Sequence, residues 1–154
     1  MSEQQVTQYS IPGTSARKSA SLFNWGNILA ILPGLIAVTI VGTENTNHKA
    51  IIVMFIMMIV PNILWFGASI VIYIISRHHP NERVGYYTQH AAYRYYAIIG
   101  VIIVAGTFYG TAVKLWLITW IITTLILVPW SLIDIWRIRK ETWPDMTIDK
   151  EVRD

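Results

Sequence analysis

Four long runs of apolar residues dominate the chain, and each is long enough to cross a lipid bilayer as a helix. They run over about Leu22–Val41, Ile51–Ile75, Tyr93–Ala112 and Leu115–Trp136. An α-helix needs about 20 mainly apolar residues to span the hydrocarbon core, where every backbone polar group must be bonded internally. The pattern therefore predicts an all-α, polytopic membrane protein with four transmembrane helices.

The polar segments between the runs predict how the helices are connected. Gly42–Lys49 and Gly110–Lys114 are short, so the helices on either side of each are expected to form antiparallel hairpins. Ser76–Ala92 is the longest connection, with a turn signal at Pro80-Asn81, and its later part is expected to lie on the membrane surface. The chain then divides into a polar N-terminal segment (1–21), a four-helix membrane domain (22–136) and a charged tail (137–154).

The composition agrees with a chain that lies mostly in the membrane. Hydrophobic residues make up 54% of the 154 residues and charged residues 14%, whereas a soluble domain has about 25% charged residues. The absence of cysteine excludes disulfides, thiolate metal sites and cysteine nucleophiles. The net charge of +3 arises from basic residues that flank the apolar runs, so it indicates membrane orientation rather than a nucleic-acid partner.

The distribution of Lys and Arg predicts which side of the membrane each connection occupies. Of the 12 basic residues, only Lys49 and Lys114 lie in the two short connections. The others lie in the N-terminal segment, in or beside the middle connection, or in the tail. Because cytoplasmic segments of membrane proteins carry the excess of Lys and Arg, both termini and the middle connection are expected on the cytoplasmic side of the inner (plasma) membrane.

Polar residues within the second and fourth runs predict which helix faces point inward. At helical spacing they form one stripe on each helix, and a polar group left against lipid without a partner is costly. Two interpretations stay open: hydrogen bonds between helices that fix their packing, or a polar path for an ion or small solute. The stripes consist of Asn62, Ser69, Tyr73 and Ser76 in the second run, and Thr119, Thr123, Trp130 and Asp134 in the fourth.

Asp134 is the one acidic residue inside a predicted span. Arg137 follows three residues later, a spacing that allows an ion pair on a helix. Arg77 and Arg94 are expected at a similar depth on neighbouring helices, which predicts a charge network near the cytoplasmic ends. Ionisable residues in a membrane are functional candidates, but a position about one turn from the interface also suits a structural role.

The histidines of the middle connection are candidate contact residues. His78, His79 and His90 could in principle bind a metal, but the only nearby acid is Glu82 and no zinc-binding spacing such as HExxH is present. We therefore predict no metal, haem or other cofactor. No nucleophile–base pair and no glycine-rich phosphate loop are present either, so the sequence indicates no enzymatic activity.

A resemblance to a known family covers a little over half of the chain, Ile59–Thr147. Its pieces are Pro61-Asn62-Ile63-Leu64-Trp65, then Gln89-His90-Ala91-Ala92, then Trp143-Pro144. In this order they resemble the small bacterial membrane proteins related to the Tic-type component of chloroplast import. Tyr93-Arg94-Tyr95-Tyr96 departs from the polar residues usual in that family. The resemblance implies a helical membrane fold and a membrane location rather than an activity.

The sequence favours a non-enzymatic integral membrane protein that is a subunit or small partner of a membrane complex. Its cytoplasmic loop and tail would contact other membrane proteins or a second copy of the chain, and the bilayer surrounds its helices. The alternative is a small transport protein for an ion or small solute. That alternative requires an oligomer, because four helices enclose little space for a pore.

Overall fold

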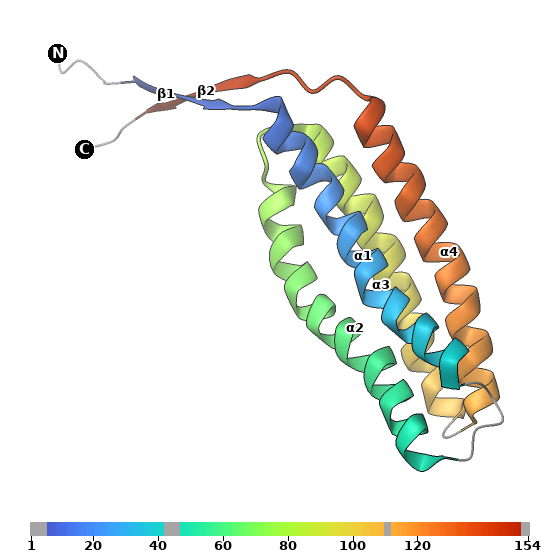
Figure 1. Cartoon of the computed structure of the whole chain (residues 1–154). Helices are drawn as coiled ribbons and strands as arrows, with labels where there is room; N and C mark the ends of the chain where they lie inside the picture. Colours follow the sequence, from blue (N-terminus) through green and yellow to red (C-terminus); the bar gives the residue numbers. More distant parts are fainter. Residues whose placement is uncertain (1–5, 42–46, 110–111, 152–154) are drawn as a thin grey trace.

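The computed structural model describes residues 6–41, 47–109 and 112–151, and four long helices dominate it (Figure 1). They are α1 (Gly13–Val41), α2 (His48–Arg77), α3 (Glu82–Tyr109) and α4 (Val113–Lys140). All four are long and apolar enough to cross a membrane. The predicted four-helix transmembrane architecture is confirmed.

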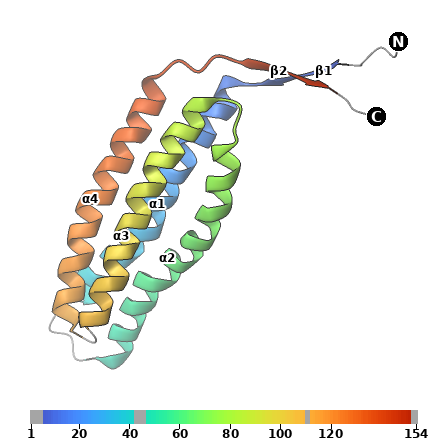
Figure 2. The same cartoon turned by 180° about the vertical axis from the view of Figure 1, so that it is seen from behind.

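The helices pack as two antiparallel hairpins, α1–α2 and α3–α4, with α1 at the centre of the contacts. α1 packs against each of the other three helices, and it is the most buried of the four, whereas α2 is the least buried. Figures 1 and 2 show α1 and α3 side by side between α2 and α4. The largest buried side chains of the core include Phe23, Ile31, Tyr95, Trp120 and Leu127.

The connection between α2 and α3 is much shorter than the sequence predicted. α2 continues to Arg77 and α3 begins at Glu82, so most of Ser76–Ala92 is helical and the predicted surface segment is wrong. Asn81 caps α3, because its side-chain oxygen accepts from the backbone N–H of Arg83 at 3.1 Å. Val84 and Ala91 in the first turns of α3 are buried, and this inward face is hard to recognise in the sequence among so many polar neighbours.

The two other connections lie partly outside the described residues, which omit 42–46 and 110–111. α2 begins directly after Asn47, whose side chain accepts from the backbone N–H of Lys49 at 3.0 Å. α4 begins at Val113, four residues after α3 ends at Tyr109. These bounds agree with the predicted hairpins.

A two-stranded sheet, absent from the prediction, joins the two ends of the chain. β1 (Val6–Ile11) and β2 (Met146–Glu151) pair antiparallel, with Tyr9 opposite Ile148 and Ile11 opposite Met146. The two strands form a β-ribbon that projects from one end of the bundle (Figure 1). We call this end of the bundle the terminal end. The N-terminal segment thus contains a strand and the first two turns of α1, and the tail contains the partner strand.

Close contacts fix the β-ribbon to the terminal end. The backbone N–H of Gly13 donates to Asp145 Oδ1 at 2.7 Å, and the Trp143 indole donates to the carbonyl of Ile138 at 2.9 Å. A Cβ at position 13 would overlap the Trp143 carbonyl, so only glycine fits where α1 begins. Trp143 also packs on a small second core, which consists of Ala16, Ala20, Val84, Tyr87 and Ile138.

Candidate functional site

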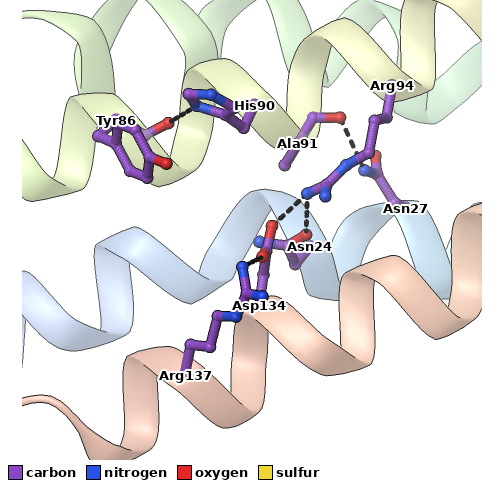
Figure 3. Close-up of polar contacts among 8 residues, drawn as sticks. All are labelled: Asn24, Asn27, Tyr86, His90, Ala91, Arg94, Asp134 and Arg137. Carbon is purple, nitrogen blue, oxygen red and sulfur yellow. Dashed lines mark hydrogen bonds and ion pairs between the residues drawn. The ribbon is translucent and has the colours of Figure 1, made fainter.

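The candidate functional site of the bundle is centred on an ion pair between α3 and α4 (Figure 3). Arg94 Nη2 donates to Asp134 Oδ2, and Arg137 Nη1 lies 3.9 Å from the other carboxylate oxygen. The Asp134 side chain is 7% exposed and that of Arg94 23%, whereas that of Arg137 is 56% exposed. The structure therefore brings these three predicted residues together, with Arg94 as the inner partner of the acid.

Two asparagines of α1, which the sequence prediction missed, complete this polar layer. Arg94 Nη2 also lies 3.4 Å from Asn24 Oδ1. Asn27 donates to the carbonyl of Ala91 at 3.1 Å and accepts from the Trp65 indole at 2.9 Å. Both asparagines are fully buried. The sequence feature that indicates this polar layer is the pair of side-chain amides three residues apart in the first apolar run, because that spacing places both on one helix face.

The surroundings of the ion pair explain why two charges can remain inside the bundle. The Trp130 ring lies 5.9 Å from the guanidinium carbon of Arg94, within the range of a cation–π contact. Trp130 itself is 48% exposed, so its predicted inward position is wrong: the indole covers Arg94 from outside. A buried carboxylate is stable only when paired, and Asp134 has its counter-ion in contact.

Asn62, at the middle of α2, links three helices. Its Nδ2 donates to the carbonyls of Ala30 on α1 and Met58 on α2, each at 2.9 Å. The Tyr95 hydroxyl of α3 donates to the Asn62 carbonyl at 3.0 Å. In the same region the Trp120 indole of α4 donates to the carbonyl of Ile31 at 3.1 Å. Side chains of α2, α3 and α4 thus bond to backbone carbonyls of neighbouring helices.

The other members of the two stripes also point inward. Ser69 is fully buried and its hydroxyl lies 3.0 Å from that of Tyr96, while Tyr73 is half-buried. Thr119 and Thr123 are buried, and Thr123 donates to the carbonyl of Trp120 at 3.1 Å. Most of these polar groups bond to a neighbouring turn or helix, which favours the packing interpretation.

Arg77 does not join the charge network that the sequence predicted for it. Its guanidinium donates to Gln89 Oε1 at 2.7 Å, and Gln89 donates to the Tyr93 hydroxyl at 2.6 Å. These residues form a separate exposed chain of hydrogen bonds between α2 and α3. Arg77 therefore lies at the terminal end, as expected, but away from Asp134.

The three histidines bond locally rather than to one another. His78 and His90 each contact the backbone carbonyl four residues earlier, at 2.8 and 2.9 Å, and His79 accepts from the backbone N–H of Asn81 at 3.0 Å. The His90 ring also lies against Tyr86, with centroids 4.2 Å apart (Figure 3). Among the described residues, no three His, Asp or Glu side chains are close enough to hold a metal ion.

An apolar cavity of about 380 Å³ lies among α2, α3 and α4. Aromatic side chains make up much of its wall, and Asn62 is the one amide that lines it. Such a lining is suited to hydrocarbon groups and offers few polar atoms that could replace the hydration shell of an ion. Its aromatic lining residues are Phe55, Phe66, Trp116 and Trp120.

The hydrogen bonds and the ion pair described above hold the four helices together, and many polar groups lie at the terminal end. The resemblance of Ile59–Thr147 to the Tic-type family stays a prediction. No protein-family model, curated protein or solved structure gives a significant match to this chain.

Proposed function

We propose that the protein is a non-enzymatic subunit or small partner of a membrane-protein complex, and that its β-ribbon is the contact surface. The observation that carries this proposal is the antiparallel pairing of Val6–Ile11 with Met146–Glu151 at the end of the bundle. A sheet of two strands is marginally stable in water, and its outer edges can pair with another chain. Addition of a strand from a partner is a common mode of recognition.

The side chains of the β-ribbon support the same role. Tyr9 and Ile11 lie on the same face as their cross-strand partners Ile148 and Met146. These four residues make this part of the face apolar, and Tyr9 is 54% exposed. The opposite face carries the polar residues Gln8, Ser10, Thr147 and Asp149. We propose that an extended segment of a partner protein adds a third strand and packs on the apolar face.

We place the β-ribbon on the cytoplasmic side of the inner membrane. The support is the distribution of basic residues: Lys49 and Lys114 are at the far end of the bundle, whereas the other described Lys and Arg residues lie at the terminal end or, like Arg94, in the half of the bundle next to it. Cytoplasmic segments carry this excess. A partner would therefore meet the β-ribbon in the cytoplasm or at the cytoplasmic surface of the membrane.

The alternative, transport of an ion or small solute, has less support. Asn62, Ser69 and Thr123 donate to or lie against neighbouring protein groups, and the cavity beside Asn62 is mainly apolar. We expect the purified protein in liposomes to pass no small ions or neutral solutes above the level of empty liposomes. Reproducible flux that Asn62→Leu abolishes in a folded protein would establish transport instead.

Photo-crosslinking in intact cells tests the contact surface. A photoreactive amino acid at Gln8 or Thr147, one on each strand, is expected to yield adducts with the same membrane protein. Phe108 is the matched control, because it is 82% exposed and lies far from the β-ribbon on α3. Ile148→Lys should abolish the adduct while the far-UV spectrum of the helices stays unchanged.

Other crosslinking outcomes would overturn the proposal. Adducts with lipid alone at both strand positions would show that the β-ribbon lies on the membrane surface. Equal capture of the partner from Phe108 would show contact through the helices rather than the β-ribbon. An adduct only with a second copy of the chain would make the contact a homo-oligomer interface.

A further inference from the structure

A second feature of the terminal end is a basic cleft between α1 and α4. It has a volume of about 510 Å³ and is lined by Arg17, Lys18, Ser21 and Trp25 of α1 and by Ile138 and Arg139 of α4. Three of these six residues are cations, and no carboxylate lines the cleft. We call it the basic cleft.

The three cations of the basic cleft are not neutralised by the part of the protein that the structure describes. None of Arg17, Lys18 and Arg139 takes part in an ion pair among residues 6–41, 47–109 and 112–151. All three are exposed. Like charges gathered in one cleft raise its positive potential and attract an anion.

A neighbouring cleft at the terminal end differs from the basic cleft in how its charges are compensated. It has a similar volume, about 540 Å³, and also contains two cations, Arg83 and Lys140. Glu141 lies in that cleft, 3.8 Å from Arg83, and Arg83 also donates to the carbonyl of Thr142 at 3.0 Å. Its charge is therefore partly compensated, whereas that of the basic cleft is not.

The depth of the basic cleft identifies the kind of anion that reaches it. Lys18 lies one turn before Leu22, where the first apolar run begins, and Arg139 lies just after Trp136 at the end of the fourth. Trp25, 38% exposed, lies at the inner side of the cleft. Tryptophan is typical of the boundary between headgroups and hydrocarbon. The cleft therefore opens at headgroup level, in the wall of the bundle.

We propose that the basic cleft binds the headgroup of an anionic phospholipid. The guanidinium groups of Arg17 and Arg139 suit bidentate contact with phosphate oxygens, and Lys18 adds a third positive charge. Trp25, which is partly exposed, would contact the glycerol backbone and the first carbons of the acyl chains. Basic pockets between helices at the cytoplasmic surface bind acidic headgroups in this way, and the bound lipid would join the ends of α1 and α4. This inference does not rest on the proposed role of the β-ribbon.

Native mass spectrometry of the full chain tests this site. The protein would be released from nanodiscs that contain equal amounts of phosphatidylglycerol and phosphatidylcholine. The wild type is expected to retain one phosphatidylglycerol in preference to phosphatidylcholine. Lys18→Gln with Arg139→Gln should lower this retention about tenfold or more, since each cation near an anionic surface strengthens binding several-fold.

The matched control is Arg83→Gln with Lys140→Gln, which also removes one Lys and one Arg from the same end. This control is expected to retain phosphatidylglycerol as the wild type does. Equal losses in both double variants would show attraction to net charge alone and would overturn the proposal, as would no loss in either. Lys18→Arg with Arg139→Lys keeps the charge and should keep the lipid, which excludes misfolding as the cause of a loss.

A competition experiment distinguishes a lipid from a soluble phosphate. Glycerol phosphate at millimolar concentration is expected not to displace the retained lipid, because it lacks the acyl chains that lie along α1 and α4. Displacement at that concentration would overturn the assignment to a lipid and indicate a soluble phosphate ligand.

Discussion

Arg94 of α3 lies directly against Asp134 of α4, although the two residues are 40 positions apart in the sequence. Asp134 is 5% exposed as a residue, and Asn24 of α1 approaches the same guanidinium. One buried pair therefore joins three helices near the terminal end. Because a buried charge without a partner is much less stable than a buried pair, the packing of these helices depends on both residues.

We expect Asp134→Asn to destabilise the folded bundle, because it leaves the Arg94 guanidinium without a counter-ion. Loss of one partner of a buried pair costs about 3–5 kcal/mol. Arg137→Gln is the control: Arg137 is 3.9 Å from the same carboxylate but its side chain is 56% exposed, so its removal should cost about 0–1 kcal/mol. Thermal unfolding in detergent measures both, and equal melting temperatures of the wild type and Asp134→Asn would contradict the buried pair.

Asn62→Leu should also destabilise the bundle, but less. It removes two hydrogen bonds, to Ala30 and Met58, and a hydrogen bond inside a membrane protein contributes about 0.6 kcal/mol on average. We expect a loss of about 1 kcal/mol. Thr124→Val is the control, because the buried Thr124 hydroxyl has no hydrogen-bond partner among the described residues. A larger loss for Thr124→Val than for Asn62→Leu would show that these amide bonds do not fix the packing.

Gly34→Ala should destabilise the contact between α1 and α4. A Cβ at position 34 would overlap the indole of Trp120, which is itself buried and bonded to Ile31. Overpacking of this kind costs about 1–3 kcal/mol. At Gly67 of α2 a Cβ would meet nothing within 4 Å, so Gly67→Ala should be neutral or stabilising by about 0.5–1 kcal/mol. Unfolding by a denaturing detergent compares the two variants, and equal stability would contradict the close approach of α1 and Trp120.

Trp143→Ala is expected to loosen the β-ribbon without unfolding the helices. The Trp143 indole bonds to Ile138 and packs on the second core beside Ala16 and Ala20, so its loss removes the anchor that precedes β2. Hydrogen exchange should become faster in Val6–Ile11 and Met146–Glu151 and stay unchanged in the middle of α2. Unchanged exchange in both strands would show that the pairing does not need this anchor.

The helices could be predicted from the sequence because hydrophobic length is a strong and local signal. The inward position of Asn62 and Ser69 and the contact between Asp134 and Arg137 also followed from helical spacing. The sequence of the first turns of α3 predicts a surface segment, because the polar residues Gln89 and His90 obscure the inward face that contains Ala91. Helical spacing predicts an inward position for Trp130, whereas its side chain is 48% exposed and lies over the guanidinium group of Arg94.

The pairing of β1 with β2 could not be predicted in the same way. Its partners, such as Tyr9 and Ile148, lie at opposite ends of the sequence, and each strand is only 6 residues long. Such pairing depends on the bundle, which brings both chain ends to one place. The position of Asn24 beside Arg94 depends likewise on how α1 packs, although the two amides of α1 gave a signal.

Labelling of single cysteines in intact cells is the most direct test of the predicted topology. That topology has four crossings of the membrane and both chain ends in the cytoplasm. The native chain has no cysteine, so His48→Cys, Glu82→Cys and Gln8→Cys each report one position, and all three sites are exposed. We predict that a membrane-impermeant thiol reagent added outside labels position 48 alone, and that positions 82 and 8 react only after the membrane is opened. Labelling of positions 82 and 8, but not 48, from outside would contradict the orientation, and labelling of 8 and 82 on different sides would contradict the four-span fold.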